Sequence, residues 1–347
     1  MLNNRVILRQ AVEQMYAQLP NWSEACANYA ALDQVWTRQL SPEPNEGQRE
    51  THTIAQAANW ENLSIMFNPG RVRSTTAKVE KGVPTSRPCF LCQQNRPREQ
   101  KWVEWRTYEV LVNPYPIFSR HLTIVCQTHT RQSIVGRMAD MVALTRALDD
   151  YDYLPLTNVA DNNKGGEYAG SYMVFFNGAC CGASAPDHCH FQAVGGKGVP
   201  FGFLSACRMG LGESIYTSTE GWIAASESTG RLVYCISPSD DADAEVLLKK
   251  LCELRAIDLD MCNIMSLWDG DRAEIWVVPR RAFRPWQFTA EGEEKVMVSP
   301  ATVEICGMLI SPRREDYESM TETLARNILK QVTYAHDTEL QPVKTTK

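Results

Sequence analysis

The chain has 347 residues, of which 44% are apolar, and its formal net charge at pH 7 is −6. That length is sufficient for two domain-sized units or one large one, and the acidic balance argues against a protein that binds bulk nucleic acid or anionic membranes. No run approaches the ~20 apolar residues of a membrane helix, and the first residues lack the apolar core and cleavage site of a signal peptide. We therefore expect a cytoplasmic protein with a small-molecule ligand, and expect most of its twelve cysteines to be reduced.

The first elements in the chain are predicted to be helical. Val6, Leu8, Val12, Met15 and Leu19 recur at helical spacing, and the polar break SPEPNEGQRETH follows. From about residue 65 the composition changes, first to a turn-rich basic stretch and then to a segment rich in Cys and Pro. Strands are predicted at residues 107–113 and 121–126.

A repeated order of elements follows. A helix is predicted within 131–150, with Met138, Met141, Val142, Thr145 and Leu148 on one face, and strands are predicted at 171–177 and 188–194. The same order returns as strands at 221–228 and 231–237, a helix at 241–254, and strands at 262–268 and 273–279. A last helix is predicted within 313–336. We infer a structural duplication whose second copy contains no histidine.

The stretch PDHCHFQAV, residues 186–194, holds two of the six histidines. On a strand, His188, His190 and Gln192 would share one face, and the alternative is a half-exposed strand with polar residues in solvent. Upstream, Asn177, Gly178, Gly182 and Ser184 form a small-residue loop that lets backbone amides and a hydroxyl approach an anion, although such loops are also common as plain turns. A neutral imidazole at His190 is a competent nucleophile toward phosphorus.

HCHFQ resembles the HxHxQ signature of the histidine triad superfamily, in its nucleotidyltransferase and phosphorylase branch. The resemblance implies an α+β histidine-triad-like fold, with antiparallel sheets, packed helices and a degenerate second half. It also implies that His190 becomes nucleotidylated, while Gln192 hydrogen-bonds the phosphate without acting as an acid or base. Ser184 is a candidate donor to the same phosphate.

NPYPIFSRHLTIVCQTH, residues 113–129, resembles the superfamily's strand, turn and strand. The resemblance implies that Asn113 lies near the nucleotide ribose and that His121 supports the active strand. From the sequence alone, His121 is equally compatible with a residue at a strand edge.

Cys89 and Cys92 form a CxxC on a proline-flanked turn, a spacing that lets two thiolates bind one tetrahedral metal. A redox motif and a pair of buried thiols are the alternatives. In uridylyltransferases and some smaller histidine triad proteins, a CxxC binds zinc together with two histidines. The matching residues are Cys89, Cys92, His129 and His188, which implies a closed structural zinc site.

FNPGR at residues 67–71, and residues 298–322, resemble the GDP-L-galactose and GDP-D-glucose phosphorylases. The resemblance implies transfer of a nucleoside monophosphate from a nucleoside-diphosphate hexose to phosphate. Arg71, Arg73 and Lys78 form a basic cluster that could hold phosphates or could be solvated surface cations. The alternatives are a dinucleoside polyphosphate phosphorylase and a zinc-containing nucleotide-binding module whose catalysis has lapsed.

Four parts of the chain are expected. They are an N-terminal helical extension (1–64), a catalytic half with the zinc knuckle (65–200), the degenerate second half (201–295) and a C-terminal strand and helix segment (296–347). The protein is expected to be a monomer or a homodimer.

Overall fold

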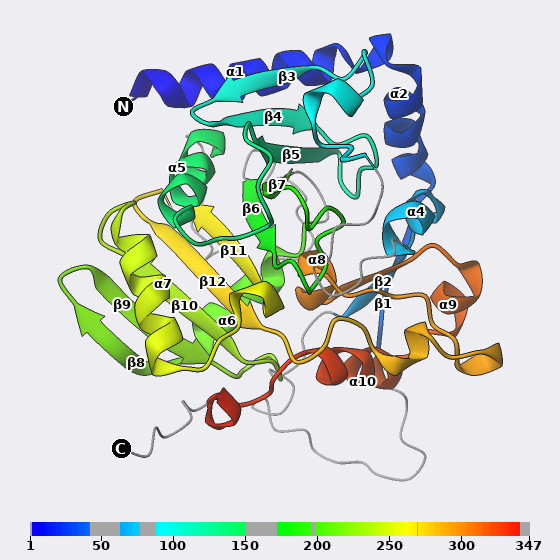
Figure 1. The fold of residues 1–347 in the computed structure, drawn as a ribbon. Coiled ribbons are helices and arrows are strands. Elements are labelled where there is room, and N and C mark those ends of the chain that lie inside the picture. The colour runs from blue at the N-terminus through cyan, green and yellow to red at the C-terminus, as the bar shows by residue number, and fades with distance from the viewer. Residues whose placement is uncertain are drawn as a thin grey trace.

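The structure is a computed structural model, and it describes residues 2–41, 63–76, 88–149, 172–195, 199–268 and 270–340. The longer helices (Figure 1) are α1 (Leu2–Ala17), α2 (Ser23–Ala30), α5 (Met138–Leu148), α6 (Phe201–Met209), α7 (Asp243–Leu254) and α10 (Glu322–Val332). The shorter ones are α4 (Val72–Thr75), α8 (Thr302–Ile305) and α9 (Arg314–Ser319). Three-residue and four-residue 3₁₀ turns include η2 (Ala31–Gln34), η4 (Pro69–Arg71) and η10 (Asp337–Leu340).

A ten-stranded antiparallel sheet forms the centre of the molecule, in the order β3-β4-β5-β7-β6-β11-β12-β10-β9-β8. The strands of its first half are β3 (Trp102–Trp105), β4 (Tyr108–Val112), β5 (Arg120–Cys126), β6 (Tyr172–Asn177) and β7 (His190–Gly195). Those of its second half are β8 (Leu211–Ser218), β9 (Gly221–Ser226), β10 (Val233–Pro238), β11 (Cys262–Trp268) and β12 (Ala273–Pro279). A separate three-stranded sheet contains β1 (Trp36–Gln39), β2 (Ser64–Phe67) and β13 (Met308–Ser311).

The two halves of the large sheet have the same topology. Read from the β3 edge the first half runs β3-β4-β5-β7-β6, and read from the β8 edge the second runs β8-β9-β10-β12-β11. The halves join where β6 pairs with β11, from Asn177 opposite Asn263 to Val174 opposite Ser266. The expected α+β fold, its antiparallel sheet and its duplication are therefore confirmed.

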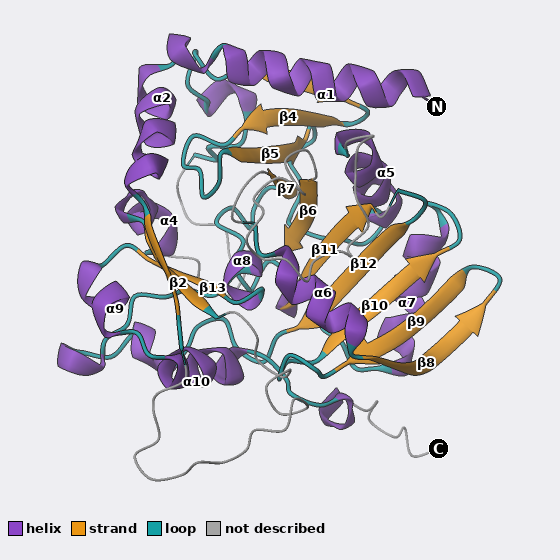
Figure 2. Ribbon diagram, turned by 180° about the vertical axis from the view of Figure 1, so that it is seen from behind, coloured by secondary structure: helices purple, strands orange, loops and turns teal. Residues whose placement is uncertain are grey.

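Alternation along the strands assigns residues to two cores. On β7, Phe191 and Ala193 face the core under α1, α5 and α7, whereas Val194 faces the core under α6, α8 and α10. Figure 1 shows α5 and α7 in front of the sheet, and Figure 2, from behind, shows α6 and α8 in front of its other face. Helix α5 buries the predicted stripe, from Met138 to Leu148, against this sheet.

Several boundaries differ from the sequence predictions. Strand β7 begins at His190, so His188 lies in the turn before the strand rather than on it. The last helix is broken at Met320, because Thr321 accepts a hydrogen bond from the Leu324 amide and so starts α10 as a new helix. Strand β1 was not expected in the N-terminal segment.

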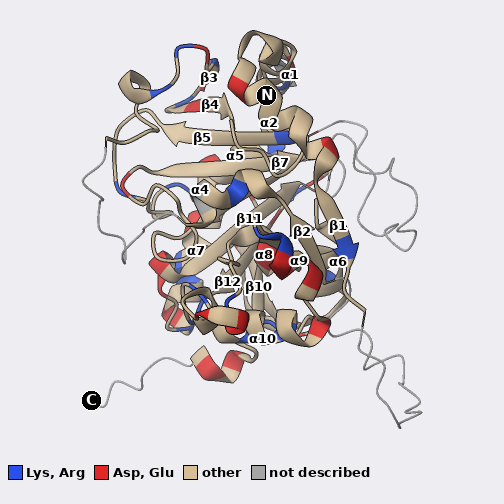
Figure 3. Cartoon of the chain, turned by 90° about the vertical axis from the view of Figure 1, so that its right-hand side faces the viewer, with Lys and Arg blue, Asp and Glu red and all other residues tan. Residues whose placement is uncertain are grey.

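None of the helices in the described residues is both long and apolar enough to cross a bilayer. Acidic and basic residues are interspersed over the elements seen in Figure 3, without a large patch of one sign in that view.

Candidate active site

A belt of polar side chains crosses one face of the first half of the sheet. The β5–β7 register places His121 opposite Val194, Thr123 opposite Gln192 and Val125 opposite His190, so these residues share a face. The belt consists of Asn113, His121, Thr123, Gln192, His190 and Asn177. It lies on the sheet face that α6 and α8 cover in the second half.

His190 is buried, with 3% of its surface exposed, and its tautomer is defined by its neighbour. Nδ1 lies 2.8 Å from the carbonyl oxygen of His188, which can only accept, so Nδ1 carries the hydrogen. Nε2 therefore bears the lone pair, and within the described residues no hydrogen bond is made to it. Burial lowers the pKa of His190 to about 4. The ring is thus neutral, with an electron pair on Nε2.

Gln132 fixes the backbone of His190 in place. Its Oε1 accepts from the His190 amide at 2.8 Å, and its Nε2 donates to the carbonyl oxygens of His190 (3.1 Å) and Asn177 (2.9 Å). This buried amide replaces the pairing with β6 that β7 lacks at His190. The sequence analysis did not find Gln132, because a glutamine in a loop carries no signal that it is buried.

His121 orients Gln192. The Ile117 amide donates to His121 Nδ1 at 3.2 Å, so the His121 hydrogen is on Nε2, which lies 2.9 Å from Gln192 Oε1. Because that oxygen accepts from His121, the NH2 group of Gln192 is turned away from His121. Burial lowers the pKa of His121 to about 3, so the ring stays neutral. His121 is therefore a buried support and not merely a residue at a strand edge.

Beyond His121, the polar belt reaches Asn113, which is hydrogen-bonded to Tyr115 at the edge of a cavity. Asn113 donates to Thr123 Oγ1 at 3.1 Å, and its Oδ1 accepts from the Tyr115 amide at 2.9 Å. Arg71, half-buried at the end of η4, donates to the Tyr115 carbonyl at 3.0 Å, and its charge contributes to lowering the pKa of His121. Arg71 thus lies near His121 and the polar belt. Lys78 and the side chain of Arg73 are outside the part of the chain that the structure describes.

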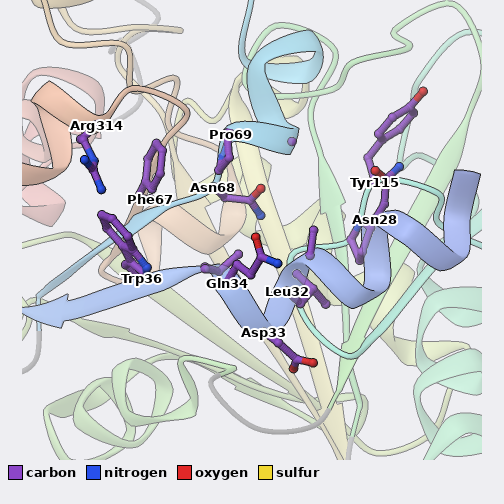
Figure 4. A pocket seen from close by; sticks show the side chains of 14 residues that line it. Asn28, Leu32, Asp33, Gln34, Trp36, Phe67, Asn68, Pro69, Tyr115 and Arg314 are labelled. Carbon is purple, nitrogen blue, oxygen red and sulfur yellow. The ribbon is translucent and has the colours of Figure 1, made fainter.

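The cavity has a volume of about 700 Å³ and lies between η2, β1, η4 and the β4–β5 turn. In Figure 4, Trp36, Phe67 and Arg314 line one side, whereas Asn28 and Tyr115 line the other. Gln34 and Asn68 turn their amide groups toward each other between these sides. The N-terminal segment therefore contributes to both sides of the cavity, with Trp36 on one side and Asn28 on the other.

The loop after β6 is held against the second half of the molecule. The amides of Gly178 and Cys180 donate to the carbonyls of Cys262 and Asp260, each at 2.9 Å. Glycine is required at 178, because a Cβ there would approach the Asp260 carbonyl oxygen to 2.4 Å. These two amides are thus not available to an anion, contrary to what the loop's composition suggests. Ser184, also predicted for the site, is half-buried in this loop.

The four predicted metal ligands come together. The ligand atoms of Cys89, Cys92, His129 and His188 all lie within 4.8 Å of one another. The distance from Cys89 Sγ to His188 Nδ1 is 3.3 Å, and that from Cys92 Sγ to His129 Nδ1 is 3.1 Å. Tetrahedral zinc with ordinary Zn–S and Zn–N bonds would separate such atoms by about 3.6 Å. The cluster thus fits zinc after a small expansion.

The hydrogen bonds around the cluster favour metal binding. His188 Nε2 lies 2.8 Å from the Cys126 carbonyl oxygen and must donate to it, which leaves Nδ1 with its lone pair directed at the sulfurs. Arg96 donates to the Leu91 carbonyl at 2.7 Å and forms a buried ion pair with Glu109 of β4 at 2.6 Å. The CxxC loop is therefore fixed to the sheet independently of a metal.

The second half has no equivalent site. On β12, Trp276 and Val278 occupy the face that bears His190, Gln192 and Val194 on β7, and both are fully buried in the core. Glu274, on the same face, pairs with Arg208 of α6. The face is filled with packed side chains instead of a polar belt.

A family model described as a domain of unknown function, DUF4922, matches residues 14–159 and 157–195, which together make up more than half of the chain. The chain belongs to the DUF4922 family. A second model, described as the C-terminal domain of GDPGP1-like proteins, matches residues 265–345 of this DUF4922 member. No curated protein matches it in sequence.

Crystal structures of the yeast Ap4A phosphorylase Apa2 share the fold. One of these structures is 15% identical to this chain and covers 90% of this chain and 96% of its own, with a TM-score of 0.51. The AMP complex is 17% identical and covers 94% of this chain and 98% of its own, with a TM-score of 0.50. The Ap4A complex is 16% identical and covers 90% of this chain and 96% of its own, with a TM-score of 0.52. The similarity spans both halves of the DUF4922 member, so the whole architecture is shared.

Proposed function

We propose that this DUF4922 member is a nucleotidyltransferase of the phosphorylase type, and that its substrate is a nucleoside-diphosphate hexose, with GDP-hexose favoured. The observation that carries the proposal is the unprotonated Nε2 of buried His190, fixed by the Nδ1 hydrogen bond to the His188 carbonyl. The match of residues 265–345 to the GDPGP1-like C-terminal domain supports the GDP-hexose class.

The reaction has two displacements at the α-phosphorus. His190 Nε2 forms a bond to phosphorus while the bond to the bridging oxygen breaks, which releases hexose 1-phosphate. An oxygen of inorganic phosphate then attacks the same phosphorus, yields the nucleoside diphosphate and frees His190. The His188 carbonyl stabilises the positive charge that the ring carries in the intermediate, because it accepts from Nδ1 throughout.

The remaining predicted residues are assigned roles around this chemistry. The Gln192 NH2 group donates to a phosphoryl oxygen, Ser184 donates from the loop, and Asn113 contacts the ribose. Gly178 shapes the loop, and Asn177 is a further substrate-binding residue. The 700 Å³ cavity lined by Tyr115 receives the base, and Arg71, which donates to the Tyr115 carbonyl, contacts the phosphates. Zinc at Cys89, Cys92, His129 and His188 is structural, because four protein ligands leave no open position.

The test is a covalent adduct. Mass spectrometry of the wild type with GDP-hexose and no phosphate should show one added nucleoside monophosphate, and His190→Ala should show none. His336→Ala is the matched control, because His336 lies on the surface and pairs with Glu227. Failure of the wild type to form an adduct with any nucleotide would overturn the proposal.

Ap4A is the second candidate substrate, favoured by the shared fold of the yeast Ap4A phosphorylase over 90% of this chain. Incubation with phosphate and, in turn, GDP-hexoses, UDP-hexoses and Ap4A separates the candidates by product. Release of hexose 1-phosphate identifies a sugar nucleotide, whereas release of ATP from Ap4A identifies the dinucleotide.

A further inference from the structure

The histidine-free second half contributes buried polar residues to the belt. Asn263 of β11 lies opposite Asn177 of β6 and is fully buried. Its Nδ2 donates to Asn177 Oδ1 at 2.7 Å and to the Cys181 carbonyl at 3.1 Å. A polar side chain in the apolar strand CNIMSLW thus connects the second half to the end of β6.

The orientation of the Asn177 amide follows from its partners. Oδ1 accepts from Asn263 Nδ2 and also from the amide and the hydroxyl of Thr302, at 3.1 and 2.7 Å. With three donors around the oxygen, the NH2 group must point the other way. Asn177 is 4% exposed, and no described residue accepts from its Nδ2. Nδ2 is not among the fully enclosed polar atoms of the described residues, so this donor can be reached by water or by a bound ligand.

The site of transfer lies beside this donor. Gln132 bridges the carbonyls of Asn177 and His190, and continuation of the β6–β7 register places the two residues opposite each other. Both side chains lie on the face of the polar belt. The nearest anionic ligand to Asn177 Nδ2 would therefore be the phosphoryl group at His190.

Arg280, just after β12, fixes Asn263 in turn. Its Nη1 donates to Asn263 Oδ1 at 2.6 Å and to the Pro300 carbonyl at 3.0 Å, and its Nε donates to the Val332 carbonyl at 2.9 Å. Because a guanidinium has no acceptor, Asn263 must present its oxygen to Arg280 and its NH2 group to Asn177. The amide orientation is thus set from Arg280 to Asn263 to Asn177.

We propose that Arg280 and Asn263 are positioning residues, which hold Asn177 so that its Nδ2 donates to a phosphoryl oxygen during transfer at His190. This inference rests on the proposed function, because the positioning of Asn177 serves the proposed transfer reaction at His190. It assigns a role to the second half that its missing histidines do not suggest.

Asn263→Asp tests the inference. The new carboxylate keeps the Arg280 contact, which preserves the fold, but it can no longer donate to Asn177 and repels its oxygen. The single-turnover rate of adduct formation from GDP-hexose should fall about 100-fold, as for loss of one oxyanion donor. Binding of guanosine, which has no phosphate, should stay near wild type, whereas the Tm should fall because the buried hydrogen bonds to Asn177 and to the Cys181 carbonyl are lost. Asn327→Asp, at an exposed position on α10, is the control and should react like wild type.

A wild-type rate in Asn263→Asp would overturn the positioning role, because the adduct itself would then form without it. Equal weakening of guanosine binding would indicate a general structural defect and would also overturn it. Arg280→Lys should give a smaller loss of rate, since a lysine keeps a donor but not the fixed fork.

A second readout does not need turnover. The side-chain amide resonance of Asn177, assigned by its loss in Asn177→Asp, should shift when inorganic phosphate is added to the wild type and should not shift in Asn263→Asp. If no adduct forms but this pattern is seen, the proposed reaction fails and the positioning stands. An unresponsive wild-type resonance would overturn the inference.

Discussion

His190 and His121 are both buried and neutral, yet they carry their hydrogens on different nitrogens. The His188 carbonyl accepts from Nδ1 of His190, whereas the Ile117 amide donates to Nδ1 of His121. One backbone carbonyl and one backbone amide therefore leave the lone pair on Nε2 of the first ring and make Nε2 of the second a donor to Gln192. Such assignment by neighbouring backbone groups cannot be read from the spacing of histidines.

Gln192→Glu tests the donor role at the residue scale. The new carboxylate still accepts from His121 Nε2, but it places negative charge where the phosphate binds. We expect kcat/KM to fall about 10²- to 10³-fold, as for loss of an oxyanion donor, with little change in Tm. Gln127→Glu, at an exposed position after β5, makes the same change outside the site and should be neutral. Comparable activity in the two variants would contradict the assignment.

At the scale of elements, the CxxC loop, the end of β5 and the turn before β7 meet at the cysteine–histidine cluster. Zinc there would join three segments that are distant in sequence and would fix the turn that carries the His188 carbonyl. The start of β7 at His190 matters here. His188 lies in the turn before the strand, and from there its Nδ1 is directed at the sulfurs of Cys89 and Cys92.

Cys89→Ser should abolish zinc binding. Metal analysis should show about one zinc per chain in the wild type and none in the variant, and the Tm should drop by roughly 5–10 °C. Cys26→Ser, in α2 outside the cluster, should retain both the metal and the Tm. Unchanged zinc content in Cys89→Ser would contradict the site.

Close packing of the 178–184 loop on α8 gives a second prediction at this scale. Gly182 has a φ of +113°, and a Cβ on it would lie 2.6 Å from the Ala301 Cβ, whereas Gly292, with a φ of +61°, has open space around it. Gly182→Ala should therefore lower the free energy of unfolding by about 1–3 kcal/mol more than Gly292→Ala. Denaturant titration of both variants measures the difference, and equal losses would exclude close packing as the cause.

At the scale of the whole molecule, the C-terminal segment is tied to the second half by Asp337. Its carboxylate accepts from Arg255 Nε at 2.6 Å and from the Tyr234 hydroxyl. Its pKa lies below the ordinary value of 3.8: burial opposes this, but the hydrogen bonds from Arg255 and Tyr234 outweigh it.

The sign of the pH effect follows from that lowered pKa. Stability from Asp337 is present above pH 3.8 and is lost as the pH falls through its folded-state pKa. Asp337→Asn should destabilise the protein at pH 7 by about 1 kcal/mol and should reduce the loss of stability below pH 4. Glu253→Gln, which removes an exposed pair with Lys250, is the control. Identical acid profiles for wild type and Asp337→Asn would contradict the role.

Local pattern predicted the repeat well. Alternation placed four of the five strands in each half, and helical spacing placed α5 and α7, because these elements bury one regular face, whereas the edge strands β3 and β8 were not predicted. The short strands β1 and β2 escaped prediction, and β13 was expected only as a strand within residues 296–347, since the pairing of these strands depends on segments far apart in the chain. For the same reason the candidate site was found only in part: His190, Gln192 and the metal ligands lie in motifs, whereas Gln132, Asn263 and Arg280 act through long-range contacts.

Trp276 is buried on β12, at the place in the second half that corresponds to the polar belt on β7. This difference between the halves has a consequence for kinetics. If the proposed transfer takes place, a chain with a polar belt in one half accepts one nucleotidyl group, whatever its oligomeric state. Rapid mixing with excess GDP-hexose should therefore give a burst of hexose 1-phosphate equal to the concentration of chains, not twice that value. Without phosphate, release should stop there, so the burst counts competent chains and serves as an active-site titration.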